Sequence, residues 1–465
     1  MSSRASRPPG TASRRVIVIG AGMSGLAAAL ALRAAGCEVT LLEARERPGG
    51  RVETLRAPFS AGLYAEAGAT YIPAVHDLTM GYVQRYGIAL HPIPEDQLFT
   101  FWHIAGRRIR IGGEESWPVE LSRKEQALGL RGMLEHYISP GVARLGQYTE
   151  SGWPDAACAD LDQMTYRQYL ELQGASPGAI HLMRRIFPDI HGEGIEDVSA
   201  LFCLRDFTNE GGGWSLIAHG SEHLPRALAA ELGEIIRYGA VVDRIEHGPD
   251  GVAVRFRQAA NVRWEHGDHL VVALQFSCLR DIEIEPRFST EKQRAINALS
   301  FSSVSRSYLQ MDTKYWQDGP QYMGISDLPT TMGIRDASYH LPGRRGLVEC
   351  YIPGPTARRV AAMSEAEGLA WTLSHVEQLL PGAAEHVELG TLKSWDNDPF
   401  ARGGYAFYRP GQMRELLPHV GRPEGRVHFA GCHTSPWPSW IQGALHSGHR
   451  VADEIARFKL GGVSI

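Results

Sequence analysis

The sequence predicts an α/β fold in which a Rossmann-like, doubly wound domain is interleaved along the chain with an α+β domain of mixed sheet and helices. The first observation is a continuous run of β-branched residues over 16–19, which indicates a buried parallel strand. An Ala/Leu-rich segment over 24–35, followed by Gly36, predicts a helix and its end. A second strand is expected over 38–43. A strand–helix–strand unit of this kind opens a doubly wound sheet.

Two further observations place parts of the same domain later in the chain. Strands are expected over 240–245, 252–256 and 269–274, separated by turn residues. The closing segment, 426–457, is again a strand, a glycine-rich turn and a helix. Because these signals lie at the start, in the middle and at the end, two domains must interleave along the sequence.

The intervening stretches predict the second domain. From 76 to 213 the chain is expected to be mostly helical, and 287–392 is expected to mix strands with one helix near 365–380. A Ser/Arg/Pro-rich leader is expected to be disordered. The predicted boundaries are 1–13 for the leader, 14–76, 214–286 and 393–458 for the nucleotide-binding domain, and 77–213 and 287–392 for the substrate-binding domain.

Composition excludes several classes of protein. With 43% hydrophobic and 21% charged residues and a net charge of -5, the 465-residue chain has the balance of a soluble protein and no basic surface for nucleic acid. Six cysteines without a C-x-x-C pair predict reduced thiols in a cytoplasmic protein, and the histidines show no metal spacing. Arg14-Arg15 and the apolar stretch after it resemble a twin-arginine export signal or a membrane span. Glycines interrupt this stretch, and it is shorter than the roughly 20 residues of a membrane span, so both interpretations are disfavoured. We expect no membrane partner.

A nucleotide fingerprint, Gly20-Ala21-Gly22-Met23-Ser24-Gly25, joins the first strand to the helix. The first glycine permits a tight turn, the second lets the backbone approach a pyrophosphate, and the third lets helix and strand pack closely. The phosphates then face free N–H groups and the positive end of the helix dipole. Glu43 ends the second strand, where it can accept hydrogen bonds from a ribose. The sequence therefore predicts dinucleotide binding and disfavours NADP.

Further motifs resemble the flavin amine oxidases, the family of monoamine, polyamine and L-amino-acid oxidases. Glu43-Ala44-Arg45 through Gly49-Gly50-Arg51 is similar to its FAD signature, and 429–448 resembles its closing motif, which holds the flavin ring and ribityl chain. Val242 falls where the family's backbone meets the adenine. Fingerprint and resemblance together imply a Rossmann-like FAD-binding domain with these cofactor-binding residues: Gly20, Gly22, Ser24, Gly25, Glu43, Ala44, Arg45, Gly49, Gly50, Arg51, Gly68, Ala69, Thr70, Val242, Gly431, Cys432, Trp440, Ile441 and Ala444.

The resemblance also implies a reaction. Such an enzyme takes a hydride from the carbon next to an amine nitrogen onto flavin N5, giving an imine, and dioxygen reoxidises the flavin to give hydrogen peroxide. Tyr405 and Trp440 fall where the family places the two aromatic side chains that align the amine. Gly404 stands where monoamine oxidases have a flavin-bonded cysteine, so FAD is expected to be non-covalent. Cys432 replaces a usual glutamate and is expected to be a small packing residue.

Two positions bear on oxygen and on substrate. Arg306 stands where the family's lysine holds a water near N5, which leaves a dehydrogenase open as well as an oxidase. Tyr71 stands where many L-amino-acid oxidases have the arginine that pairs with the substrate carboxylate. A buried carboxylate without its partner costs about 3–5 kcal/mol. Unless another arginine substitutes, simple or secondary amines are favoured over α-amino acids.

Other readings of the sequence stay open. An L-amino-acid oxidase or dehydrogenase of the same family is the first alternative. A non-catalytic carrier on the same flavin scaffold and an NAD-dependent dehydrogenase are the others, although the retained Gly49-Gly50-Arg51 and closing motif weigh against the carrier. The sequence does not decide between a monomer and a homodimer.

Overall fold

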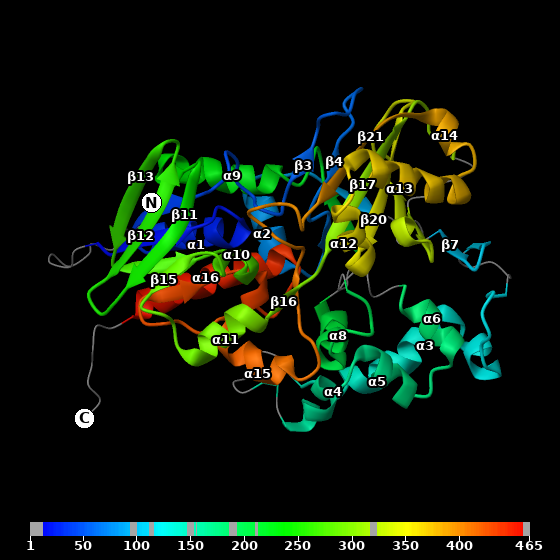
Figure 1. The fold of residues 1–465 in the computed structure, drawn as a ribbon, viewed down its shortest axis with the longest axis horizontal. Helices are drawn as coiled ribbons and strands as arrows, with labels where there is room; N and C mark the ends of the chain where they lie inside the picture. The colour runs from blue at the N-terminus through cyan, green and yellow to red at the C-terminus, as the bar shows by residue number, and fades with distance from the viewer. Residues whose placement is uncertain are drawn as a thin grey trace, which may run out of the picture.

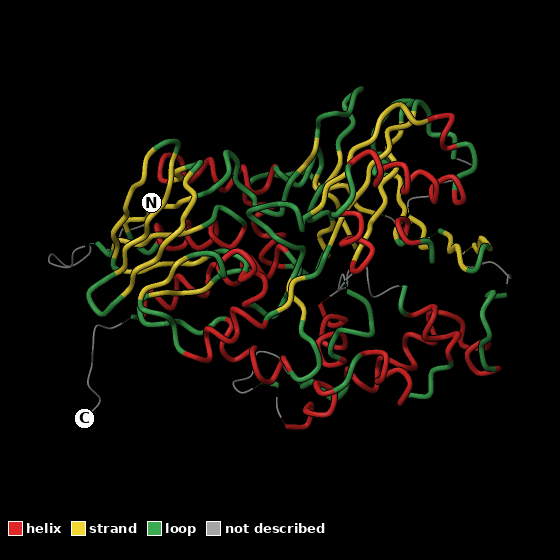
Figure 2. The backbone as a smooth tube through the Cα atoms, viewed as in Figure 1, coloured by secondary structure: helices red, strands yellow, loops and turns green. Residues whose placement is uncertain are grey.

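The computed structural model describes residues 13–458, with gaps at 94–99, 111–115, 147–152, 155, 186–192, 210–212 and 317–322. Apart from Ser13, the predicted leader lies outside the described residues. Two groups of strands lie at opposite ends of the long axis, and a set of helices lies below the second group (Figure 1). Figure 2 shows the same division, with strands in yellow and helices in red.

A parallel five-stranded sheet confirms the predicted Rossmann-like fold. Its strand order is β10-β2-β1-β14-β23, and every pair of neighbours is parallel. Val16, Ile17, Val18 and Ile19 are all buried, as the apolar run predicts. The strands are β1 (Arg15–Ile19), β2 (Glu38–Leu42), β10 (Ile236–Arg237), β14 (His269–Val272) and β23 (Val427–Phe429).

Two helices from opposite ends of the chain pack together against this sheet. They are α1 (Met23–Ala34), blue in Figure 1, and α16 (Ile441–Arg457), red. Gly448 makes the close approach, since a Cβ there would lie 2.6 Å from the Ser24 carbonyl oxygen. Gly25 has the packing role predicted for the third glycine of the fingerprint, because a Cβ there would lie 1.9 Å from the Gly20 oxygen. The two ends of the chain therefore meet at the nucleotide turn.

A four-stranded sheet, β13-β12-β11-β15, covers the outer end of this half. The prediction omitted both edge strands of this sheet, β13 and β15. The residues of β13 are exposed except at 265 and 267, so the strand lacks the alternation that marks a half-buried strand. The strands are β11 (Ala240–His247), β12 (Val252–Gln258), β13 (Asn261–Gly267) and β15 (Glu283–Glu285).

The other half is built on a seven-stranded mixed sheet of order β21-β17-β20-β19-β18-β7-β8. The β7–β8 hairpin corrects the expectation of a mostly helical 76–213. Its turn has positive φ at Ala105 and Gly106. Alanine is not typical of such turns, so the sequence carried no clear hairpin signal here. The strands are β7 (Phe101–Ile104), β8 (Arg107–Arg110), β17 (Val304–Met311), β18 (Met323–Ser326), β19 (Gly333–Asp336), β20 (Gly346–Pro353) and β21 (Val387–Ser394).

Three smaller sheets connect the two halves. The three-stranded sheet, of order β5-β9-β6, brings the segment after the FAD signature beside residues 214–217. The strands are β3 (Thr54–Leu55) with β4 (Ala65–Glu66), β5 (Tyr71–Pro73) with β6 (Leu90–Ile93) and β9 (Trp214–Ile217), and β16 (Ser300–Phe301) with β22 (Ala406–Phe407).

More than one helix lies within 287–392, which corrects the prediction. Ser289 caps α11 by accepting a hydrogen bond from the Lys292 backbone, and α12 has Pro355 in its first turn, where a proline is tolerated. The remaining helices are α2 (Asp77–Arg85), α3 (Arg123–Val142), α4 (Ala159–Gln163), α5 (Tyr166–Leu172), α6 (Pro177–Met183), α8 (Ala200–Asp206), α9 (His223–Leu232), α10 (Phe276–Leu279), α11 (Thr290–Ala298), α12 (Gly354–Ala361), α13 (Glu365–Leu379), α14 (Ala383–His386) and α15 (Gln412–Val420).

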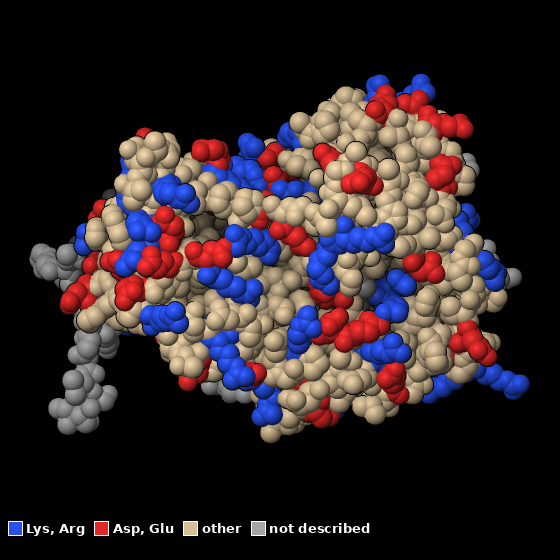
Figure 3. Space-filling view, viewed as in Figure 1, with Lys and Arg blue, Asp and Glu red and all other residues tan. Residues whose placement is uncertain are grey.

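The division into two domains stays a prediction. α2, which the predicted boundary assigns to the substrate-binding domain, packs against α16, and the Tyr82 hydroxyl is 3.1 Å from His449 Nε2. No helix in the described ranges is both long and apolar enough to cross a membrane. Positive and negative side chains are interspersed on the face drawn in Figure 3.

Candidate active site

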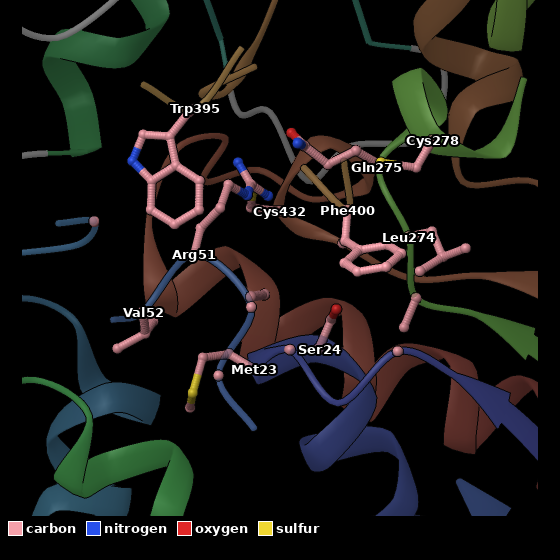
Figure 4. Close-up of a pocket in the computed structure, with 18 of the residues that line it drawn as sticks. Met23, Ser24, Arg51, Val52, Leu274, Gln275, Cys278, Trp395, Phe400 and Cys432 are labelled. Carbon is pink, nitrogen blue, oxygen red and sulfur yellow. The ribbon is translucent and has the colours of Figure 1, made fainter. Parts of the chain in front are cut away.

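One large cavity runs from the nucleotide turn to the seven-stranded sheet. Its volume is about 710 Å³. Met23 and Ser24 form its floor at the start of α1, with Trp395 on one side and Leu274 and Phe400 on the other (Figure 4). A cavity of this size, with polar groups at defined places in an apolar wall, is typical of a site for a cofactor and a small substrate.

The glycine turn and Glu43 form the base of the cavity. Gly20 has a φ of +98°, and Gly22 precedes the first residue of α1. The Glu43 carboxylate accepts hydrogen bonds from the backbone N–H groups of Ala21 at 2.6 Å and Arg45 at 2.8 Å. Burial raises the pKa of Glu43, against the lowering effect of these two hydrogen bonds. A buried acid is thus fixed beside the turn, as a ribose ligand requires.

The Gly49-Gly50-Arg51 loop lies on this turn. Gly49 donates its N–H to the Ala21 carbonyl at 2.8 Å, and Gly49 and Gly50 have φ values of +105° and +57°. These conformations favour glycine, which explains the pair. The Arg51 guanidinium extends into the cavity, where it donates to the Gly404 carbonyl and lies 3.7 Å from Cys432 Sγ. The loop therefore places the positive charge of Arg51 between the N-terminal motif and the closing motif.

The closing motif supplies buried polar groups without partners among the described residues. Both ring nitrogens of His433 and the Nε1 of Trp440 are buried and make no hydrogen bond there. Burial, followed by the charge of Arg51, lowers the pKa of His433 to about 3, so this ring is neutral. Buried donors and acceptors normally have partners. Because both residues line the cavity, a bound ligand is the natural source of those partners.

Aromatic side chains surround the far end of the cavity. Trp214 on β9 packs edge-to-face on Tyr71, with ring centroids 5.5 Å apart, and lies 5.7 Å from Trp440. The hydroxyl groups of Tyr351 and Tyr405 are hydrogen-bonded to each other. All five residues line the cavity. They line a mostly apolar chamber with a few hydroxyl groups.

Arg306 also lines the cavity, next to Thr70. One of its nitrogens, Nη1, donates to the Glu66 carbonyl at 2.8 Å, to Thr70 Oγ1 at 2.9 Å and to Glu349 Oε1 at 3.0 Å. Burial is the largest single effect and disfavours its charge, but the Glu349 carboxylate, together with smaller contributions from Tyr308 and Tyr351, outweighs burial and raises the pKa of Arg306. Arg306 is therefore a permanently charged group held rigidly on the cavity wall.

Glu66 lies behind this wall and titrates near neutrality. Its carboxylate accepts from Thr54 Oγ1 at 3.0 Å and from the Ser221 N–H at 2.9 Å. Burial raises the pKa of Glu66 to about 7, opposed by these hydrogen bonds and by the charge of Arg306. The folded protein therefore binds a proton here that the unfolded chain releases at lower pH.

The free energy of unfolding is expected to fall less with rising pH in the Glu66→Gln variant than in the wild type. A folded pKa above the unfolded value of 4.5 gives stability that is complete below pH 4.5 and lost as pH rises through about 7. The contribution of Glu66 is on the order of 3 kcal/mol at most. The measurement is the urea-unfolding midpoint of wild type and variant from pH 5 to 8. Parallel curves would contradict the assignment.

Nearly all residues that the sequence analysis predicted to be catalytic or cofactor-binding lie around this one cavity. Of the predicted catalytic and cofactor-binding residues, all except Gly25 line the cavity. The sequence reasoning missed several wall residues: Trp214, Leu274, Gln275, Arg335, Tyr351, Trp395 and His433. His433 lies inside the closing motif, so the motif could have indicated it. Arg335, in the sequence Gly-Ile-Arg-Asp, could have been recognised as a charged residue within an apolar strand. In the described part of the chain no group of three or more His, Cys, Asp or Glu side chains could hold a metal ion.

Comparison with known proteins identifies the family. The sequence model that describes the family of flavin-containing amine oxidoreductases matches residues 23–456 of this chain. The chain belongs to this family. Membership confirms the resemblance of the two terminal motifs and makes the protein a flavin enzyme that oxidises amines. This flavin amine oxidoreductase is 30% identical to YobN of Bacillus subtilis (strain 168) over 466 residues, which cover 96% of this chain and 95% of YobN.

Further relatives and solved structures agree with the family. An L-amino-acid oxidase of Siganus canaliculatus is 28% identical over 455 residues, 95% of this chain and 85% of that protein. The fold of the flavin amine oxidoreductase matches putrescine oxidase bound to putrescine with a TM-score of 0.83 at 21% identity, covering 96% of this chain and 99% of that one. Cyclohexylamine oxidase from Brevibacterium oxydans IH-35A matches with a TM-score of 0.81 at 22% identity, over 96% and 99% of the two chains.

Proposed function

We propose that the protein binds FAD non-covalently and oxidises the C–N bond of a small amine to an imine, with dioxygen as the electron acceptor and hydrogen peroxide as the second product. The observation that carries the proposal is the single cavity that joins the nucleotide turn to the aromatic chamber. A dinucleotide held at the turn has room to extend to the chamber where an amine would lie. Six free cysteines agree with a cytoplasmic location.

The cavity residues suit FAD in charge and in shape. At the turn, Gly22 has open space where a Cβ would point, and the N-terminus of α1 favours phosphate. Arg51 adds a positive charge, and Glu43 is fixed as an acceptor for ribose hydroxyl groups. Trp440 Nε1 and the His433 nitrogens are the buried polar atoms that a flavin could satisfy. These groups fit the roles that the resemblance assigns.

The surroundings of Gly404 support non-covalent attachment. A Cβ on Gly404 would lie 2.7 Å from Val304 Cγ2 and 2.9 Å from Ser302 Oγ. A side chain that could bond a flavin is therefore absent here, and the local packing leaves no space for one. Cys432, which lines the cavity, is 3.7 Å from the Arg51 guanidinium. We assign it a packing role.

When bound, the flavin would supply the hydride acceptor for the carbon next to the amine nitrogen. The protein's own contribution is to orient the amine and to exclude water. Tyr405 and Trp440 would flank the amine, with the Tyr405 hydroxyl fixed by Tyr351. Overall, an amine R₂CH–NH₂ and dioxygen give the imine R₂C=NH and hydrogen peroxide. The imine leaves the chamber and hydrolyses in water.

The test is a flavin and peroxide assay on purified protein. We expect a yellow protein that releases all of its flavin as FAD when acid-denatured, and equal amounts of oxygen consumed and peroxide formed with a suitable amine. Flavin that stays with the acid-precipitated protein would show covalent attachment. Reduction of the flavin by an amine, with little reoxidation by oxygen, would indicate a dehydrogenase. A protein that takes up no FAD would overturn the proposal.

A further inference from the structure

A second arginine lies at the substrate end of the cavity. Arg335 is on β19, the strand beside β20 in the seven-stranded sheet, and its side chain lines the cavity. Only 6% of Arg335 is exposed. Its Nη1 donates to the Tyr71 hydroxyl, and its guanidinium carbon lies 5.3 Å from the centre of the Tyr71 ring. Arg335 is therefore positioned next to the residue that replaces the arginine of many L-amino-acid oxidases.

Arg335 shares its carboxylate with Arg306. The same Glu349 oxygen lies 3.0 Å from Arg306 Nη1 and 3.7 Å from Arg335 Nε. The shorter contact goes to Arg306, which Glu66 and Thr70 also hold in place. The three side chains Arg306, Arg335 and Glu349 carry two positive charges and one negative charge. These three side chains alone sum to +1, and Glu66, which interacts with Arg306, adds a negative charge above its pKa of about 7.

A buried positive cluster selects among amines. It repels the second ammonium group of a diamine and attracts an anionic group, and both effects are strong where the dielectric constant is low. The planar guanidinium fork matches a carboxylate in two hydrogen bonds, and a tyrosine hydroxyl can donate a third. Arg335 and Tyr71 together offer such a set of donors on one side of the aromatic chamber.

We propose that Arg335, assisted by the Tyr71 hydroxyl, binds a carboxylate of the substrate, so that this enzyme oxidises amino acids in preference to simple amines or diamines. This inference rests on the proposed function and names its substrate class. The substrate carboxylate would pair with Arg335, the arginine that lies further from the Glu349 oxygen. Arg335 thus takes over the role of the carboxylate-binding arginine that Tyr71 replaces. It comes from a strand more than 260 residues further along the chain.

The experiment compares substrate pairs that differ only in a carboxylate. Holoenzyme is assayed with each common L- and D-amino acid and with the amine formed by its decarboxylation, for example phenylalanine and phenethylamine. The readout is the ratio of the two kcat/KM values for the best pair. We expect a ratio of about 100 or more for the wild type, and a loss of about 100-fold in this ratio for Arg335→Met, mainly through the KM of the amino acid.

Three further variants separate carboxylate binding from a structural role. Arg335→Lys keeps the charge but not the fork and should lose part of the ratio, and Tyr71→Phe should lose about tenfold. Arg344→Met, on the exposed surface of the same half, is the matched control and should keep the ratio. Titration with benzoate, a carboxylate that cannot be oxidised, should perturb flavin absorbance with a Kd at least tenfold weaker in Arg335→Met.

The outcomes distinguish the two proposals. If the flavin is bound and simple amines reduce it as well as amino acids do, the carboxylate site is wrong and the proposed function stands. If Arg335→Met lowers both members of a pair equally and leaves benzoate binding unchanged, Arg335 is a packing residue and the inference fails. If no flavin is bound, or if no substrate reduces it, the proposed function fails first.

Discussion

Substituting Gly22 with alanine is expected to leave the folded apoprotein intact and to weaken FAD binding about 100-fold or more. Gly22 has a φ of -69°, which any residue can adopt, and a Cβ there would meet no protein atom within 4 Å. The protein alone gives no reason for a glycine at this position. The Cβ would point into space that the proposed function assigns to the pyrophosphate, so it would displace charge-assisted hydrogen bonds worth about 1.5–3 kcal/mol each.

Two glycine variants provide the controls for this prediction. Gly81→Ala also places a Cβ in open space, but on the exposed face of α2, and should not change FAD affinity. Gly25→Ala should lose soluble protein, because its Cβ would lie 1.9 Å from the Gly20 oxygen. The measurements are the Kd for FAD by fluorescence quenching and the thermal midpoint without FAD. Unchanged FAD affinity in Gly22→Ala would mean that the pyrophosphate lies elsewhere.

The nucleotide half was predictable because its signals are local. The turn 20–25 and the acid at 43 lie within one strand–helix–strand unit, where each residue type follows from the geometry of a phosphate site. The closing motif was recognisable for the same reason. Its contact with the first motif, through Gly448 and the Ser24 carbonyl, joins the two ends of the chain, and only the three-dimensional structure shows it.

The substrate end was only partly predictable because it is assembled from distant strands. Trp214 comes from β9, Arg335 from β19 and Tyr351 from β20, and none of them lies in a motif. Their convergence depends on sheet pairing, which a sequence pattern does not encode. Short polar elements such as β13 and α11 were missed for a different reason, since their stability comes from neighbours rather than from their own periodicity.

Replacing Arg306 with lysine is expected to speed reoxidation of the reduced flavin by dioxygen about tenfold, a change of about 1.4 kcal/mol in barrier. The Arg306 guanidinium is fixed by Glu66, Thr70 and Glu349, and its charge is spread over three nitrogens. A lysine keeps the ion pair with Glu349 but is shorter, so it leaves space for a water molecule and concentrates its charge in one ammonium group. A concentrated charge better stabilises the negative charge that dioxygen gains on reduction.

Stopped-flow mixing of the anaerobically reduced enzyme with oxygen measures this step apart from amine oxidation. Arg345→Lys, on an exposed ion pair with Glu388, is the matched control and should reoxidise like the wild type. If Arg306→Lys binds FAD normally and reoxidises at the wild-type rate, Arg306 does not control oxygen reactivity. Its remaining role would then be to hold Glu349 in place beside Arg335. In that case Arg306→Met, which unlike Arg306→Lys loses the ion pair with Glu349, should change the selection of substrates.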